Sequence, residues 1–172
     1  EIPNIEDDNL HTIIYTSGTT GTPKGVMHTV QNFMNCISGL TKELNIPKRP
    51  RVFSYLPLAH IAERLLCGGG ILLGAEISFP ESLQTFASDL KKTQPNYFFA
   101  VPRIYTKFQE KILERIPQKK LDFILKLPII KTIFKNKLKE NLGLKNASFI
   151  ASGAAPLSAS LIRWFSTIGI DI

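Results

Sequence analysis

Short apolar runs alternate along the chain with longer stretches of helical periodicity. The apolar runs, rich in β-branched and aromatic residues, are residues 11–16, 51–57, 75–79, 97–101 and 148–152. The helix-like stretches are residues 26–44, 59–74, 81–93, 101–116 and 158–169. Strands joined through helices of this length need crossover connections, which produce a mainly parallel sheet with helices on both faces. The pattern predicts an α/β fold and a single domain or subdomain over residues 1–172.

Residues 121–144 mix apolar positions with lysines, and Pro128 should split them into two helices. Residues 103–145 hold twelve lysines and arginines against four acidic residues, although the whole chain carries a net charge of only +7. Because the positive charge is concentrated in this one segment, the sequence argues against a general nucleic-acid-binding protein. Two interpretations of residues 121–144 stay open. They form a solvated helical hairpin that covers the core, or a basic apolar surface that lies on an anionic membrane.

The composition is that of a folded protein, with 44% hydrophobic and 20% charged residues. No apolar run reaches the roughly 18 residues that span a bilayer, and the first ten residues are acidic where a signal peptide would be basic. Cys36 and Cys67 lack the spacing of a zinc site or a disulfide framework, and we expect both to be core thiols. We therefore expect a cytoplasmic protein, with peripheral membrane attachment as an alternative. Because the sequence starts at Glu1 and stops inside residues 168–172, an apolar run that we expect to be a strand, we also expect a fragment cut at both ends.

The strongest chemical signal is the segment 15–26, where the first apolar run opens into small and hydroxyl residues and one lysine. Glycines permit backbone angles and close approach that a Cβ would forbid, so that amide groups can converge on an anion. Hydroxyl groups and the compact charge of a lysine suit phosphate oxygens. The residues expected to bind phosphate are Thr16, Ser17, Gly18, Thr19, Thr20, Gly21 and Lys24. The alternative is a hairpin turn without a ligand. A Walker A loop is excluded, because Pro23 precedes the lysine and Gly25 follows it.

The same segment, YTSGTTGTPKGV, resembles the phosphate-loop signature of the adenylate-forming superfamily, which includes acyl-CoA synthetases and luciferases. The resemblance implies that the loop holds the β- and γ-phosphates of ATP with Mg²⁺ while a carboxylate attacks the α-phosphate. The products would be an acyl-adenylate and pyrophosphate. Thr16 would then face the metal, and Lys24 the phosphates.

Residues 54–64, SYLPLAHIAER, resemble the second core motif of that superfamily, in the form found in long-chain acyl-CoA synthetases. The resemblance implies that His60 lines the junction of the acyl and adenylate sites; by itself, a histidine there would be interpreted as a helix-start or packing residue. The segment VPRIY at residues 101–105 resembles the VPRxxEK stretch of these synthetases, except that Thr106 replaces the acidic residue. Arg103 is expected either to steer an anion or only to bind a backbone carbonyl.

Residues 151–158, ASGAAPLS, resemble the segment of the superfamily that packs against the adenine ring. Small residues suit that role, because a flat heterocycle can lie on a backbone only where side chains are minimal. The adenine contact is expected at Gly153, Ala154, Ala155 and Pro156. Ser158 or Ser160 can cap the following helix. The alternative is a small-residue turn before a helix.

These motifs, in this order, predict the larger part of the N-terminal adenylating domain of a long-chain fatty acid–CoA ligase. The resemblance implies ATP, Mg²⁺ and CoA as cofactors or co-substrates and a fatty acid as substrate; the acyl chain length stays open. The rival functions are a fatty acyl-AMP ligase that loads a carrier protein and a nonenzymatic lipid- or membrane-binding module. The family's ribose-binding aspartate and C-terminal lobe are not found in residues 1–172, so we expect the fragment to be inactive by itself and prone to self-association.

Overall fold

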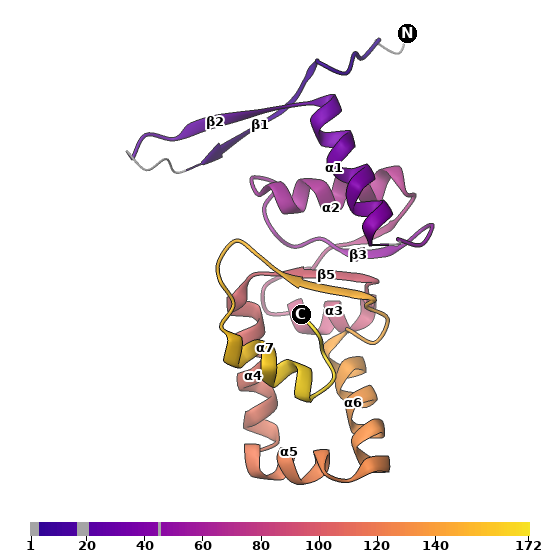
Figure 1. Ribbon diagram of the computed structural model, residues 1–172, viewed down its shortest axis with the longest axis vertical. Coiled ribbons are helices and arrows are strands. Elements are labelled where there is room, and N and C mark those ends of the chain that lie inside the picture. The colour runs from indigo at the N-terminus through magenta and orange to yellow at the C-terminus, as the bar shows by residue number, and fades with distance from the viewer. Residues whose placement is uncertain (1–3, 17–20, 45) are drawn as a thin grey trace. The chain divides into compact units, whose positions relative to one another are not determined.

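The computed structural model describes residues 4–16, 21–44 and 46–172 of the chain (Figure 1). The chain divides into two compact units. The first consists of residues 1–50 and 54–77, and the second of residues 51–53 and 78–172. The short strand β4 (Glu76–Ser78) runs over the sequence boundary between them.

The first unit begins with a hairpin of β1 (Leu10–Thr16) and β2 (Lys24–Thr29), which pair in antiparallel register. The sequence predicts β1, but residues 26–29, which it assigns to a helix, belong to β2 instead. The helix α1 (Val30–Glu43) starts later because Thr29 caps it: the Thr29 Oγ1 accepts a hydrogen bond from the Asn32 amide at 3.2 Å. Cross-strand hydrogen bonds thus decide a segment whose own pattern is ambiguous.

Two helices, α1 and α2 (Ile61–Leu72), pack closely in the first unit. Phe33 and Ile37 of α1 are buried at 8% and 5% exposure. Gly68 lies in α2 against the Phe33 ring, and a Cβ there would come within 2.7 Å of the ring carbon Cε1. The absence of a side chain at Gly68 therefore allows the two helices to approach each other.

The second unit is built on a parallel sheet, which confirms the predicted α/β class. Its strands β3 (Arg51–Phe53), β5 (Tyr97–Ala100) and β6 (Phe149–Ser152) lie in the spatial order β3-β5-β6. Both of its strand pairs are parallel. The carboxyl ends of β5 and β6 are level, since Ala100 pairs with Ser152. The loops that follow these strands therefore start at the same edge of the sheet.

Helices account for most of the rest of the second unit (Figure 1). They are α3 (Phe86–Thr93), α4 (Pro102–Arg115), α5 (Gln118–Leu125), α6 (Pro128–Leu142) and α7 (Ala159–Thr167). Pro128 begins α6 and so splits residues 121–144 between two helices, as the sequence predicts. The apolar run 168–172 does not form the expected strand; Ile168 and Ile170 are instead fully buried after the end of α7.

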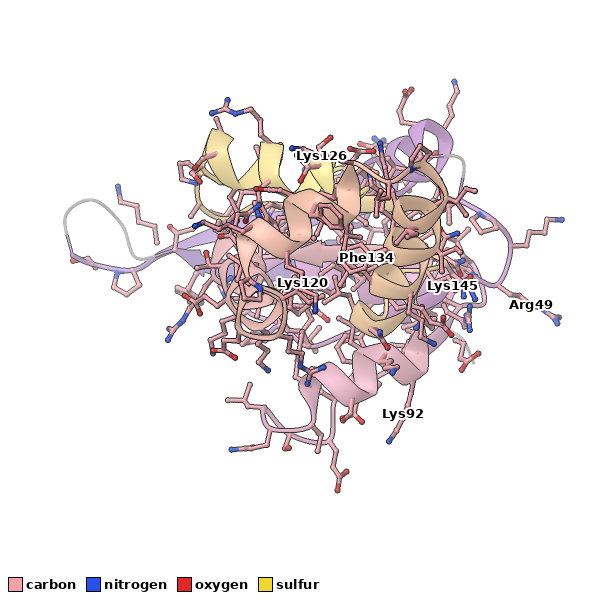
Figure 2. All side chains as sticks on the ribbon, turned by 90° about the horizontal axis from the view of Figure 1, so that it is seen from below. Arg49, Lys92, Lys120, Lys126, Phe134 and Lys145 are labelled. Carbon is pink, nitrogen blue, oxygen red and sulfur yellow. The ribbon has the colours of Figure 1, made fainter. Side chains whose placement is uncertain are left out.

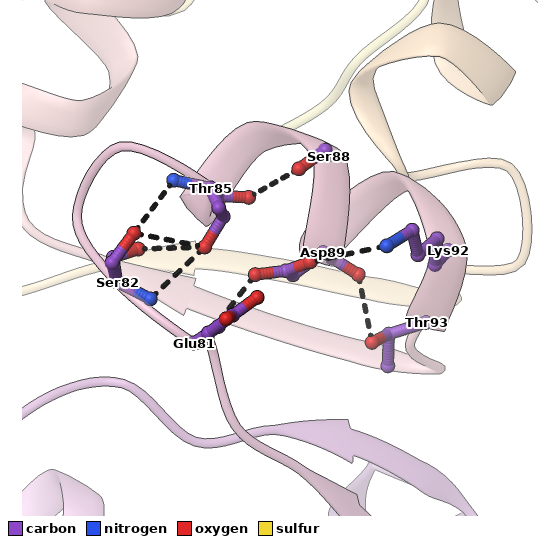
Figure 3. Close-up of polar contacts among 7 residues, drawn as sticks. All are labelled: Glu81, Ser82, Thr85, Ser88, Asp89, Lys92 and Thr93. Atoms are coloured by element: carbon purple, nitrogen blue, oxygen red, sulfur yellow. Dashed lines mark hydrogen bonds and ion pairs between the residues drawn. The ribbon is translucent and has the colours of Figure 1, made fainter.

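The start of α3 is set by reciprocal hydrogen bonds between Ser82 and Thr85 (Figure 3). The Ser82 amide donates to Thr85 Oγ1 at 2.9 Å, and the Thr85 amide donates to Ser82 Oγ at 3.1 Å. The Asp89 carboxylate accepts a further bond from the Glu81 amide at 3.1 Å. These bonds hold residues 82–85 in a turn, so the helix begins at Phe86 and not at the predicted residue 81.

Gly143 ends α6 in a left-handed conformation, with φ of +78°. A Cβ at Gly143 would meet the backbone of Leu90 at the end of α3. We expect Gly143→Ala to lower the free energy of unfolding by more than about 1 kcal/mol, because it adds left-handed strain and a backbone clash. Urea unfolding of the chain measures the change.

Gly39→Ala is the matched control. Gly39 lies within α1 with no atom within 4 Å of an added Cβ, so this variant should be stabilised by about 0.5–1 kcal/mol. Equal changes in the free energy of unfolding of the two variants would contradict the close contact between Gly143 and the Leu90 backbone.

Candidate functional site

The predicted phosphate loop is closed by the β1–β2 hairpin. Thr16 and Lys24 are direct cross-strand partners at the end of the hairpin from which the loop starts, and the Thr16 hydroxyl donates a hydrogen bond to the Lys24 carbonyl at 3.4 Å. Gly21 has a φ of +81°, which requires a glycine. The predicted residues Ser17, Gly18, Thr19 and Thr20 lie outside the described part of the chain.

Gly25 has a role that the sequence alone does not reveal. A Cβ at this position would lie 2.9 Å from the Ile13 side chain on the opposite strand. The missing side chain at Gly25 therefore leaves room for Ile13, and cross-strand packing is sufficient to explain this glycine. The Lys24 side chain belongs to an exposed residue, so its charge is accessible to an anion in this unit.

The segment that contains His60 forms the start of α2. His60 is the exposed N-cap residue, and its carbonyl accepts hydrogen bonds from the amides of Glu63 and Arg64 at 3.1 and 3.2 Å. The Arg64 guanidinium turns back and donates from Nε to the Leu58 carbonyl at 2.6 Å. Arg64 thereby fixes the loop that presents His60, a function that sequence reasoning did not assign to it.

In the same unit as His60, a cluster joins the buried Ser54 and Glu63 to the half-buried Cys67. Glu63 is 2% exposed, and the Cys67 thiol donates to its Oε1 at 3.8 Å; the Ser54 hydroxyl lies 3.4 Å from the same sulfur. Burial raises the pKa of the Cys67 thiol; the Ser54 hydrogen bond opposes this rise, whereas Glu63 adds to it. The sequence predicts core thiols at Cys36 and Cys67, but Cys36 is exposed and Cys67 is only half-buried. The buried carboxylate of Glu63, one helical turn before Cys67, was not predicted.

The second unit carries the predicted adenine-binding segment after β6. Gly153 lies on the Phe99 ring, and a Cβ there would come within 2.7 Å of it. Ala154 has a φ of +66°, which a residue other than glycine seldom adopts. Ala155 and Pro156 are exposed. The segment thus presents a surface of backbone and small side chains.

The two predicted caps after this segment have different outcomes. Ser158 is the N-cap of α7, and its hydroxyl accepts a hydrogen bond from the Leu161 amide at 3.3 Å. The Ser160 hydroxyl instead lies 3.1 Å from that of Ser158.

The buried Ser152 Oγ at the end of β6 has no hydrogen-bond partner within the described residues.

The VPRIY segment places Arg103 in the exposed first turn of α4. Thr106, which stands where the resembling synthetases have an acidic residue, donates its hydroxyl hydrogen to the Pro102 carbonyl at 3.3 Å. Tyr105 is fully buried, and its hydroxyl donates to the Ala151 carbonyl at 2.8 Å. Sequence reasoning missed Tyr105, although its place inside the motif was a signal.

The predicted site residues are divided between the units. Thr16, Lys24 and His60 belong to the first unit, whereas Arg103 and residues 153–156 belong to the second. Among the described residues, no group of three or more His, Cys, Asp or Glu side chains could hold a metal ion.

Comparison with known proteins places these motifs in one family. The family model described as AMP-binding enzyme matches residues 1–172. The long-chain-fatty-acid–CoA ligase ACSBG2 of Rattus norvegicus is 30% identical over 99% of this chain and 32% of its own length. Long chain acyl-CoA synthetase 3 of Arabidopsis thaliana is 34% identical over 94% of this chain and 28% of its own length. The chain therefore spans about a third or less of these relatives.

Solved structures agree with the fold. The A-PCP didomain of a carboxylic acid reductase from Segniliparus rugosus, in complex with AMP, is 28% identical, with a TM-score of 0.73 over 97% of this chain and 23% of that one. The O-succinylbenzoate coenzyme A synthetase of Bacillus subtilis, in complex with AMP, has a TM-score of 0.69 at 21% identity over 96% of this chain and 36% of that one. The latter supports the fold alone.

The environment of Cys67 predicts slow thiol modification. Its raised pKa keeps the Cys67 thiol protonated to higher pH than is usual for a cysteine, and only the thiolate reacts, whereas Cys36 is exposed to the reagent. At pH about 8, a small chromogenic disulfide should modify Cys36 about tenfold faster than Cys67, whose rate should rise only at higher pH. The single variants Cys36→Ser and Cys67→Ser separate the two rates; equal rates in the two variants would refute the buried cluster.

Proposed function

This chain belongs to the AMP-binding enzyme family, and we propose that the natural polypeptide containing it activates a long-chain fatty acid with ATP and transfers the acyl group to CoA. The observation that carries the proposal is the segment 15–26, whose ends pair so that Thr16 and Lys24 lie opposite each other. The similarity to named long-chain ligases supports the choice of substrate. Because the chain spans only part of those relatives, the activity is assigned to the whole polypeptide, and residues 1–172 alone are proposed to be inactive.

The proposed reaction has two steps. A carboxylate oxygen of the fatty acid attacks the α-phosphorus of ATP, and pyrophosphate leaves with the electrons of the broken P–O bond. The CoA thiol, having lost its proton, then attacks the acyl carbonyl, and AMP leaves. In the first step the cation of Lys24 and the amides of residues 17–21 would hold the β- and γ-phosphates, which orients the α-phosphorus for in-line attack.

A magnesium ion fits the chemistry of this loop. Magnesium is commonly bound through one or two protein oxygens together with phosphates and waters, so a single loop oxygen is an adequate protein donor. The Thr16 hydroxyl donates its hydrogen to the Lys24 carbonyl and keeps its oxygen lone pairs for a cation. When bound, the ion would neutralise phosphate charge.

The remaining site residues are assigned to binding. The backbone of residues 153–156 is proposed to support the adenine ring, because its side chains are small and Ala155 and Pro156 are exposed. His60 is proposed to line the junction of the acyl and adenylate sites from the start of α2. Neither role requires a proton transfer by these residues.

We also propose that residues 121–144 rest on an anionic membrane surface, where a long-chain substrate partitions. Phe123, Ile129 and Ile133 of α5 and α6 are 63%, 78% and 65% exposed. Lysines accompany them, including Lys126 within the segment and Lys120 directly before it, both of which are labelled in Figure 2. Exposed apolar side chains combined with lysines suit the interface of an anionic bilayer. No described helix is long and apolar enough to cross a membrane.

Lys24→Ala in the whole polypeptide should weaken fatty-acid-dependent pyrophosphate release. The variant loses a charge-assisted phosphate contact of about 1.5–3 kcal/mol, which corresponds to about a tenfold to hundredfold loss in kcat/KM for ATP. Lys48→Ala removes the same charge from an exposed residue outside the loop and should behave as wild type. Wild-type kinetics in Lys24→Ala would rule out the assigned role of this residue.

The double variant Ile129→Ser, Ile133→Ser should reduce binding to vesicles of phosphatidylcholine with anionic phosphatidylserine, because it removes exposed apolar area from α6. Co-sedimentation measures the bound fraction. Ile71→Ser is the matched control, since Ile71 is 72% exposed but lies in the first unit. Binding that does not depend on the anionic lipid, or that the double variant retains in full, would reject the membrane surface.

A further inference from the structure

Two buried tyrosines in the second unit differ in what their hydroxyl groups do. Tyr105 in α4 is fully buried, and its hydroxyl donates to the Ala151 carbonyl at 2.8 Å. Tyr97 in β5 is 6% exposed, and its hydroxyl has no hydrogen-bond partner in the part of the chain that the structure describes. The Tyr105 hydroxyl therefore makes a specific connection between a helix and a strand, whereas that of Tyr97 makes none.

The bond from Tyr105 reaches the backbone immediately before the small-residue segment. Ala151 is the next-to-last residue of β6, so its carbonyl lies two residues before Gly153. Gly153 rests on the Phe99 ring, and Ala154 follows with its strained φ of +66°. A strained backbone of this kind persists only when its surroundings hold it.

The ring of Tyr105 is itself held in place. Its centroid lies 6.2 Å from that of Phe98 and 5.6 Å from that of Phe165, both in edge-to-face geometry. Phe98 comes from β5 and Phe165 from α7, so the ring is fixed between the strand and the helix that follows the segment. A hydroxyl on so constrained a ring can determine where a backbone carbonyl lies.

We propose that Tyr105 is a positioning residue for the nucleotide. Its hydroxyl holds the Ala151 carbonyl, so that the backbone of residues 153–156 is placed to contact the face of the adenine ring. The proposal rests on the proposed function and assigns Tyr105 no contact with substrate. A merely structural tyrosine would affect stability alone. A positioning tyrosine affects the discrimination of adenine from other bases, because base recognition depends on the fit of the flat ring to this backbone.

Tyr105→Phe in the whole polypeptide tests the proposal, with Tyr97→Phe as the matched control. Each variant loses one hydroxyl from a buried tyrosine of the same unit, but only the first loses a hydrogen bond. We expect Tyr105→Phe to raise the KM for ATP about fivefold and to reduce the preference for ATP over GTP by a similar factor. The KM for the fatty acid should stay within about twofold, and Tyr97→Phe should match wild type in all three quantities.

Phe99→Leu provides a second test if Tyr105→Phe fails to fold, because the Phe99 ring supports the same segment at Gly153. It should likewise weaken the preference for ATP over GTP. If the wild-type protein is active and Tyr105→Phe folds but keeps the wild-type preference for ATP over GTP, the role of Tyr105 is overturned and the proposed function is left intact. A wild-type protein that releases no pyrophosphate in response to fatty acids would contradict the proposed function, and with it this inference.

Discussion

The antiparallel pairing of β1 with β2 is the constraint on which the candidate phosphate loop depends. It sets Thr16 opposite Lys24, so a hydroxyl and a cation are brought to one end of a hairpin by backbone hydrogen bonds. Gly25 is compatible with that pairing, because an added Cβ would lie only 2.9 Å from the Ile13 side chain. A loop that must bind several phosphate oxygens benefits from a fixed base, since the ordering of its ends is completed before the ligand arrives.

Small residues in this chain serve packing, and not only the proposed access for a ligand. Gly68 lets two helices approach, Gly153 rests on an aromatic ring, and Gly25 fits against the opposite strand. A sequence pattern rich in glycine, alanine and serine does not distinguish these uses, because the same missing Cβ permits each of them. The buried hydrogen bond of Tyr105 shows how larger residues can hold such a backbone in place.

Much of the fold follows from the sequence, because its strongest signals are local. The parallel strands, the break at Pro128 and the Ser158 cap depend on hydrophobic pattern, a fixed proline φ and a short side-chain bond. Errors arose where tertiary contacts override local preference, as in residues 26–29, which pair as a strand. The motifs of the candidate site were visible in the sequence, whereas the buried hydrogen bonds of Glu63 and Tyr105 could be found only in the three-dimensional structure.

In the proposed reaction, a fatty acid carboxylate attacks the α-phosphate of ATP held by the loop at residues 15–26. Following the oxygen atoms tests it directly. The whole polypeptide is supplied with ATP, CoA and a long-chain fatty acid labelled with ¹⁸O in its carboxylate, and the products are analysed by mass spectrometry. Attack on the α-phosphate predicts one labelled oxygen in AMP and none in pyrophosphate. Labelled inorganic phosphate formed together with ADP, or AMP formed without a fatty acid, would contradict the account.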